Sequence, residues 1–244
     1  MKKTILSMFA AAMSITATAQ TDIWYWQDGK ATKVESVDSI TFAEPQAAAP
    51  VTTHEYVDLG LSVKWATCNV GAEKPEDYGD YFAWGETTPK TEYSLSTYKF
   101  TTDGGNSFTK YTGSDKTVLD AADDAATANW GGAWRMPTYE EVQDLLDNCT
   151  WEWQAASNTE FGGVAGFKVT SKKTGYTDKY IFLPAAGYRS GTGVKAAGSW
   201  DHYWSSSLDA DYPRNAYGLR FSSGSKDCGG GRYYGDTVRP VLQN

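Results

Sequence analysis

The sequence predicts an α+β fold made of short strands, one clear helix and long loops. Two observations support the strands and loops. The 24 glycines punctuate short runs rich in aromatic and β-branched residues, and stretches such as residues 85–106 follow neither a helical nor a strand period. A third observation supports the helix, because one segment combines a helix start signal with an apolar stripe at helical spacing.

The N-terminus has the pattern of a signal peptide covering residues 1–19. Lys2 and Lys3 precede an apolar or small stretch that ends in the cleavage signal Ala17-Thr18-Ala19. We therefore expect export to the cell surface, the periplasm or the medium. The stretch is too short to span a bilayer, and no later run approaches the required length, so no membrane span is expected.

Three segments are predicted after the signal peptide. Residues 20–43 form a small β unit, in which Asp28-Gly29 marks a hairpin turn. Residues 44–54, rich in proline and alanine, form a linker that includes His54. Residues 55–244 form one domain, long enough to bury a core of its own.

The helix of this domain is predicted to begin after Thr138. Thr138 and Glu141 match the capping-box pattern. The apolar stripe follows at i, i+3, i+4 and i+7, and consists of Val142, Leu145, Leu146 and Cys149. The alanine-dense residues 120–129 indicate a second, shorter helix.

The remaining elements are short strands, and no repeat of fixed period is present. The predicted strands are residues 57–61, 81–84, 167–170, 180–183, 203–206, 216–221 and 238–242. In the predicted strand at residues 216–221, Tyr217, Leu219 and Phe221 share one face, and the residues between them, such as Arg220, take the other. Trp151 and Trp153 also share a face if their segment is extended.

Charge and composition narrow the choice of partners. Removal of the signal peptide takes away two lysines and no acids, which moves the formal charge from −8 to −10. Without a basic cluster, a nucleic-acid partner is excluded. Aromatic residues make up 14% of the chain and suit contact sites. The three cysteines leave at least one outside any internal bridge, and Cys68 and Cys149 are either bridged or buried.

Several blocks taken in order carry a family resemblance. They are YVDLGL (56–61), VKWATCNVGA (63–72), YFAWGE (81–86), NWGGAWRMPT (129–138), LPAAGYR (183–189) and a tail from YWSS (203–206) to VRPV (238–241). Together they resemble the major paralogous domain first noted in Fibrobacter and common in secreted Bacteroidetes proteins. The resemblance covers nearly all of residues 55–244. Residues 23–42 resemble a short N-terminal unit of such exported proteins.

The resemblance implies a C-type-lectin-like fold with a small antiparallel sheet near the C-terminus. The tail is also similar to the variable end of proteins diversified by retroelements, in which a constant frame carries changeable positions. By that resemblance the frame is Tyr203, Trp204, Ala216, Leu219, Phe221, Gly224 and Val238 to Val241. The ligand-facing positions would be Leu208, Asp209, Asp211, Tyr212, Arg214, Arg220, Asp227, Cys228, Gly230 and Arg232.

No metal site and no cofactor are expected. Asp209 and Asp211 lack the further acids of a calcium loop, and Trp204 is not followed by the Asn-Asp of sugar-binding C-type lectins. Asp120, Asp123 and Asp124 are interpreted as structural acids at a helix start rather than as metal ligands.

No catalytic constellation is expected either. Glu86 is an isolated carboxylate, and the acids on the helix fall on its solvated face, namely Glu140, Glu141, Asp144 and Asp147. His202 with Ser205 to Ser207 lacks a nucleophile elbow and a third group.

These observations predict an exported, non-enzymatic, adhesin-like domain whose contact surface lies in residues 208–236 and binds a protein or a surface glycan. One alternative is a carbohydrate-active accessory or hydrolytic domain, with Glu86 and tryptophans such as Trp130, Trp134, Trp151 and Trp153 at a sugar site. Another is a structural envelope protein.

Overall fold

The computed structural model describes residues 23–27, 30–34, 54–102, 107–222 and 225–244. The chain divides into two compact units, Met1–Thr52 and Thr53–Asn244. In the first unit, β1 (Ile23–Gln27) pairs antiparallel with β2 (Lys30–Val34), with Gln27 opposite Lys30, which confirms the predicted hairpin. The predicted signal peptide, residues 35–43 of the predicted β unit and the linker up to residue 53 lie outside the described residues.

The described part of the second unit consists mainly of short strands. They are β3 (Tyr56–Val57), β4 (Val63–Ala66), β5 (Thr101–Thr102), β6 (Ser107–Phe108), β7 (Cys149–Gln154), β8 (Gly166–Ser171), β9 (Tyr180–Pro184), β10 (Tyr188–Ser190), β11 (Gly193–Lys195), β12 (Trp200–Leu208), β13 (Asn215–Ser222), β14 (Ser225–Gly231) and β15 (Val241–Gln243). The α-helices are α1 (Ala125–Trp130) and α2 (Tyr139–Asn148).

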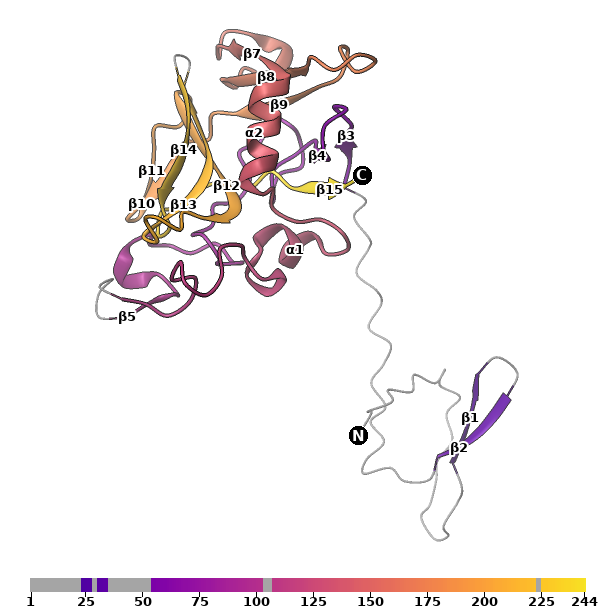
Figure 1. The fold of residues 1–244 in the computed structure, drawn as a ribbon. Helices are drawn as coiled ribbons and strands as arrows, with labels where there is room; N and C mark the ends of the chain where they lie inside the picture. The colour runs from indigo at the N-terminus through magenta and orange to yellow at the C-terminus, as the bar shows by residue number, and fades with distance from the viewer. Residues whose placement is uncertain (1–22, 28–29, 35–53, 103–106, 223–224) are drawn as a thin grey trace. The chain divides into compact units, whose positions relative to one another are not determined.

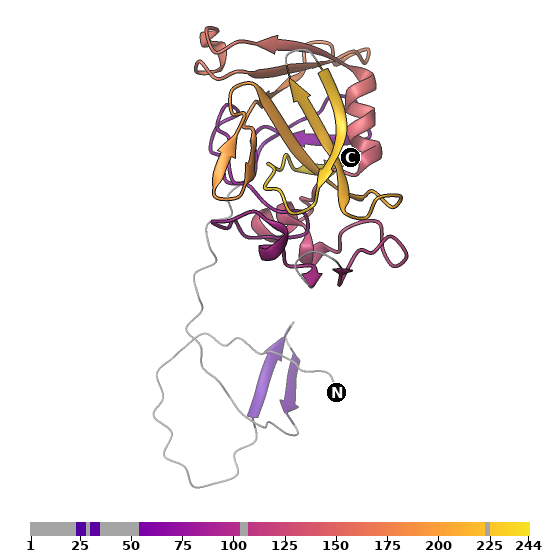
Figure 2. The same ribbon diagram turned by 90° about the vertical axis from the view of Figure 1, so that its left-hand side faces the viewer.

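The strands form small antiparallel sheets, so the predicted α+β class is correct. Strand β4 lies between β3 and β15, which places the two ends of this unit in one sheet (Figure 1). The other three-stranded sheets are β7–β8–β9 and β12–β13–β14. Helix α2 lies on one side of the β12–β13–β14 sheet and the β10–β11 hairpin on the other (Figures 1 and 2).

Helix α2 begins as its sequence predicts. The Thr138 hydroxyl accepts from the Glu141 backbone N–H, and the Glu141 carboxylate accepts from the Thr138 backbone N–H, which completes the capping box. Val142 and Leu145 are buried and Leu146 is half-buried, so the apolar stripe packs into the core. Cys149 is buried too, but it already begins β7. None of the helices in the described ranges has the length and apolar character needed to cross a bilayer.

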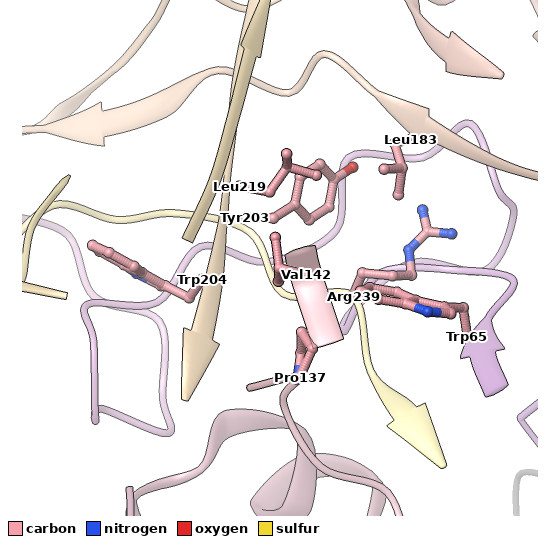
Figure 3. A pocket seen from close by; sticks show the side chains of 8 residues that line it. All are labelled: Trp65, Pro137, Val142, Leu183, Tyr203, Trp204, Leu219 and Arg239. Carbon is pink, nitrogen blue, oxygen red and sulfur yellow. The ribbon is translucent and has the colours of Figure 1, made fainter. Parts of the chain in front are cut away.

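Two apolar clusters form the core of the second unit. The first joins α2 to β4, to the β7–β8–β9 sheet and to one face of β12 and β13. The second lies among the loops around Trp84 and Trp204. At their junction remains a cavity of about 10 Å³, bordered by Tyr203, Leu219 and Val142 among others (Figure 3). Since this volume holds about one water molecule, the two clusters are tightly packed against each other.

Several predicted elements differ from the structure. The run predicted at residues 57–61 is a strand only at Tyr56–Val57, and Gly60, with a φ of +68°, lies in the bend that follows. Residues 81–84 form only an isolated bridge at Phe82, so their apolar character reflects burial in the loop core. The predicted helix at 120–129 is divided at Asp124, which caps α1 by accepting from the Thr127 backbone N–H.

The C-terminal frame is held by a buried arginine. Arg239 is 1% exposed and donates to the Oδ1 of Asn69 at 2.7 Å and to the backbone carbonyls of Ala66, Thr67 and Phe182. Val238, Pro240 and Val241 are buried on either side of it. The frame role predicted for this segment therefore has a physical basis, because one guanidinium joins β15 to β4 and β9.

Candidate ligand-binding site

The β12–β13–β14 sheet has one face in the core and one face outside it. On the core face, Tyr203, Leu219 and Phe221 belong to the first apolar cluster. On the opposite face, which we call the outer face, His202 lies directly across from Arg220. The predicted alternation of Leu219 and Phe221 with Arg220 is therefore confirmed.

The outer face contains a cavity of about 340 Å³, which we call the outer-face pocket. Its lining residues are His202, Asp209, Asn215, Arg220, Gly229, Gly230, Gly231 and Tyr234. This volume lies in the range of small-molecule pockets. Polar side chains from β12, from β13 and from the loop between them thus converge on one space with the backbone of β14.

Arg220 and His202 are joined on this face. The Arg220 Nε donates to the His202 Nε2 at 3.2 Å, and the Arg220 Nη1 donates to the carbonyl of Gly229 at 3.0 Å. Because Nε2 accepts, the proton of a neutral His202 ring is on Nδ1. That nitrogen faces Asp236, with 3.6 Å between Nδ1 and Oδ1. This separation is too long for a hydrogen bond, so the contact between the ring and the carboxylate is electrostatic only.

A pair of buried carboxyl groups lies behind His202. Asp201 is 0% exposed and Asp236 is 2% exposed. Burial raises the pKa of Asp201 well above its usual range, and the charge of Asp236 raises it further. The Thr237 hydroxyl donates to the Oδ2 of Asp201 at 3.3 Å. Asp201 therefore keeps its proton at a pH where an exposed aspartate would be charged.

Aromatic rings surround the histidine. Tyr188 stacks on the His202 ring, with centroids 4.7 Å apart and planes 5° from parallel. Tyr188 also meets the edge of Tyr234, whose ring contacts that of Tyr233. Trp200, two residues before His202 on β12, is 40% exposed. These contacts hold the rings in place at the border of the pocket.

Glycine is required on the β14 side of the pocket. Gly229 has a φ of +104°, a conformation that side chains with a Cβ rarely adopt. A Cβ on Gly231 would come within 3.0 Å of the Tyr233 ring. Gly229, Gly230 and Gly231 line the pocket, so this part of its wall has no side chains.

Of the predicted ligand-facing positions, three line this pocket and three are exposed on the loop between β12 and β13. Asp209, Arg220 and Gly230 line it. Asp211, Tyr212 and Arg214 are exposed on the loop between β12 and β13, with Tyr212 70% exposed. The backbones of Asp227 and Cys228 pair with those of Arg220 and Leu219, but their side chains lie outside what the structure describes.

Two predicted positions are wrong. Leu208 is 3% exposed and belongs to the loop core. Arg232 is 0% exposed and donates to the hydroxyl of Tyr98 at 3.0 Å. It also donates to three backbone carbonyls, those of Lys110, Tyr111 and Pro213. Burial lowers the pKa of Arg232, but an arginine stays cationic under such a shift, and this cation binds loops together rather than a ligand.

Sequence reasoning did not assign several pocket residues, namely His202, Asn215, Gly229, Gly231 and Tyr234. His202 could have been found only if the predicted strand at 203–206 had been begun earlier, because β12 starts at Trp200 and His202 then alternates with Tyr203. Asn215 and Tyr234 carry no such signal, since Asn215 is the first residue of β13 and Tyr234 lies in the loop after β14.

The isolated carboxylates considered for chemistry have structural partners. Glu86 pairs with Lys90 at 2.8 Å and accepts from the Lys99 backbone N–H at 2.8 Å. Asp123 accepts from Tyr111 at 2.8 Å and pairs with lysines. Within the described residues, no group of three or more histidine, cysteine or acidic residues could hold a metal ion.

Two acids of α2 that were predicted to lie on a solvated face have protein partners in the structure. Glu141 pairs with Arg135 at 2.5 Å in addition to capping the helix. Asp144 accepts from the backbone N–H and the hydroxyl of Ser62, at 2.9 and 2.8 Å. Both carboxylates therefore fix the position of α2 against neighbouring loops.

The remaining residues considered for reactivity are also structural. Ser205 donates to the carbonyl of Tyr217, which leaves it no role beside His202. Cys68 and Cys149 are free thiols, and burial raises the pKa of Cys149 to about 11. His54 stacks on Trp130 with centroids 3.6 Å apart, so this residue belongs to the domain and not to the linker.

Comparison of the chain with protein-family models, with curated proteins and with solved structures gave no match.

Proposed function

We propose that this protein is an exported, non-enzymatic, adhesin-like domain on a C-type-lectin-like scaffold, and that it binds its ligand at the outer-face pocket and the adjoining loop. The single observation that carries the proposal is the convergence of Asp209, Asn215, Arg220 and His202 on one cavity of about 340 Å³. Exposed loop residues beside that cavity, such as Tyr212, add contact area.

Binding fits this pocket better than catalysis does. The Nε2 of His202 is occupied by Arg220, so it is not available to take a proton from a substrate. Among the lining residues that the structure describes there is no serine or cysteine, and Asp209 is the one carboxylate. A hydrolytic site would need a nucleophile or a second acid there.

The test maps binding before the ligand is known. Amide chemical shifts of the 15N-labelled domain would be recorded against three probe sets: neutral saccharides, a pooled peptide library and charged metabolites. We expect the perturbed amides to include Asn215 and Gly229 to Gly231. Perturbations that fall on another surface, or none with any probe set, would contradict the proposed site.

Matched variants complete the test. Asn215→Ala should lower the affinity for any probe that perturbs the pocket amides by at least about fivefold, which corresponds to about 1 kcal/mol. Tyr56→Ala is the control, because Tyr56 is exposed to solvent, at 49%, and lies in another sheet. Equal loss in both variants would count against the pocket.

The alternatives have weaker support. A hydrolytic role for Glu86 is disfavoured by its ion pair with Lys90. No observation specifically favours a structural envelope protein. Diversification of the tail has its own test in the genome. It requires a reverse-transcriptase gene nearby and a near-copy of codons 203–241 that differs only at template adenines, and the absence of such a copy would remove the diversification claim.

A further inference from the structure

We propose that His202 couples the outer-face pocket to pH, because its ring can take up a second proton only when its hydrogen bond with Arg220 breaks. The coupling is a property of the unliganded pocket, and only its effect on binding rests on the proposed function. Three features support it: the bond at one ring nitrogen, the buried carboxylate near the other, and the contacts that hold the ring in place.

The Nε2 of His202 has one lone pair, and the bond from Arg220 uses it. The Arg220 Nε donates to this nitrogen at 3.2 Å, and His202 is only 4% exposed. An imidazolium ring carries a proton on both nitrogens and accepts no hydrogen bond. Protonated His202 would therefore direct an N–H at the N–H of Arg220, so the guanidinium moves away. This consequence holds whatever other partners Arg220 has, because it depends only on the lone pair of Nε2.

The other ring nitrogen favours uptake of the proton. Nδ1 lies 3.6 Å from the Oδ1 of Asp236, and neither atom has a hydrogen-bond partner among the described residues. Asp236 is 2% exposed, so water and salt screen its negative charge poorly, and that charge stabilises a positive ring. The two contacts of His202 therefore oppose each other. Asp236 favours the charged ring and Arg220 favours the neutral one.

The second buried carboxyl does not change charge when the ring does. Burial raises the pKa of Asp201 well above its usual range, and this side chain accepts from the Thr237 hydroxyl. Asp201 therefore stays neutral at acid pH, and Asp236 is the carboxylate that faces the ring. A proton gained by His202 adds one positive charge to the wall of the pocket.

The ring itself is held in place, so Arg220 is the group that moves. Tyr188 stacks on His202 with planes 5° from parallel, which resists rotation of the ring. Arg220 is half-buried and also donates from Nη1 to the carbonyl of Gly229 at 3.0 Å. Displacement of the guanidinium therefore disturbs the glycine wall of the pocket as well.

Titratable and charged residues lie on every element around the ring. They are Asp201 on β12, Asp209 after β12, Tyr188 and its cross-strand partner Lys195 on the β10–β11 hairpin, Arg220 on β13, Asp227 on β14, whose backbone pairs with that of Arg220, and Tyr234 and Asp236 after β14. Of these residues, Arg220 and Asp236 contact the ring nitrogens. The test therefore alters these two.

The experiment titrates the full-length mature protein without ligand from about pH 4.5 to 8.5, the range in which histidine changes charge. Long-range proton–nitrogen correlations of the imidazole rings report which nitrogen is protonated, and His54, the other of the 2 histidines, is the internal reference. We expect His202 at alkaline pH to carry its proton on Nδ1. The signals of the Arg220 Nε–H and of the Gly229 to Gly231 amides should shift with the same midpoint as the ring.

Two variants separate the opposing contacts. Arg220→Met removes the donor to Nε2 and should raise the midpoint of the His202 titration by about 0.5 pH unit or more. Asp236→Asn removes the buried charge and should lower that midpoint. Arg214→Met is the matched control, because it removes a cation from the exposed adjoining loop and should leave the midpoint unchanged. Thermal melts check that each variant is folded.

Several results would overturn the coupling. They are a proton on Nε2 at alkaline pH, a His202 ring that stays neutral over the whole range, and equal midpoints in Arg220→Met and the unaltered protein. If Asp236→Asn does not fold, Arg220→Met still decides. Because no ligand is added, a failure of the proposed function would leave these results unchanged. If both hold, affinity at the pocket should change across the same midpoint.

Discussion

The two faces of the β12–β13 pair use the same strands for different purposes. On the core face, Tyr203, Leu219 and Phe221 are nearly fully buried among apolar neighbours. On the outer face, His202 and Arg220 are held by hydrogen bonds around a solvent-accessible pocket. Because successive residues of a strand point to opposite faces, one face can be fixed by packing while the other keeps its chemical freedom.

A similar contrast separates two arginines of the tail. Arg220 lines the pocket, whereas Arg232 is fully buried and bonds to carbonyls of the loops. Residue type alone therefore does not show whether a polar tail position serves the ligand or the fold. The following predictions test the division between the two roles.

The largest effect is expected from Phe221→Ala. The Phe221 ring contacts Phe167 and Tyr203 on the core face, so its removal leaves a cavity. We expect the free energy of unfolding to fall by about 3–5 kcal/mol, measured by urea melts. The control is Trp200→Ala on the outer face, which should cost about 1 kcal/mol or less. An equal loss of unfolding free energy in Phe221→Ala and Trp200→Ala would contradict the distinction between the core face and the outer face.

Arg232→Met should have the next largest effect. The substitution keeps much of the side-chain volume but leaves the Tyr98 hydroxyl and the Lys110, Tyr111 and Pro213 carbonyls without their donor. We expect a loss of about 2–4 kcal/mol of stability. Arg214→Met, on the exposed loop, should change stability by less than about 0.5 kcal/mol. If the Arg232→Met variant is as stable as the unaltered protein but binds ligand poorly, Arg232 contacts the ligand and the structural role assigned to it is wrong.

Asp201→Asn should alter the pH dependence of stability. Burial raises the pKa of Asp201 in the folded state, so the folded protein binds more protons than the unfolded chain once pH exceeds about 4. The free energy of unfolding contributed by this group therefore falls as pH rises toward the folded pKa, by about 1.4 kcal/mol for each unit of elevation. The Asn variant should lose this decline in urea melts from pH 4 to 8.

The comparison needs a reference carboxylate. Asp211→Asn serves, because Asp211 is exposed on the loop between β12 and β13. If the stability profiles of Asp201→Asn and the unaltered protein run parallel across this range, Asp201 is not the protonated group.

The smallest effect on stability is expected from Tyr212→Ala. The ring is 70% exposed, so the melting temperature should change little, with less than about 0.5 kcal/mol of destabilisation. Affinity for a ligand that extends beyond the pocket should nevertheless fall. A large drop in melting temperature would place Tyr212 in the fold instead of at the contact surface.

Local signals predicted the local features of this protein. The capping box at Thr138 and Glu141 began a helix where expected, and the hairpin at residues 27–30 formed. Alternation along β13 correctly separated Leu219 and Phe221 from Arg220. Each of these features depends on contacts within a few residues or on a fixed strand period, and a sequence displays both directly.

The roles of Leu208 and Arg232 could not be predicted in this way. Both are buried through contacts with loops distant in sequence, around residues 98–117. Likewise, Tyr234 joins the pocket through its contact with Tyr188 on another strand pair. Whether a polar residue of the tail meets water or a buried carbonyl depends on which distant loop covers it.

By itself, the sequence determined the α+β class, the position of α2 and the two alternating faces of the C-terminal strands. Tertiary structure alone decided that His202, Asn215 and Tyr234 share a pocket and that Arg232 supports the core. The physical reason is that periodicity and capping are set over one or two turns of chain. A binding pocket is instead defined by long-range packing, which brings together residues that no local pattern connects.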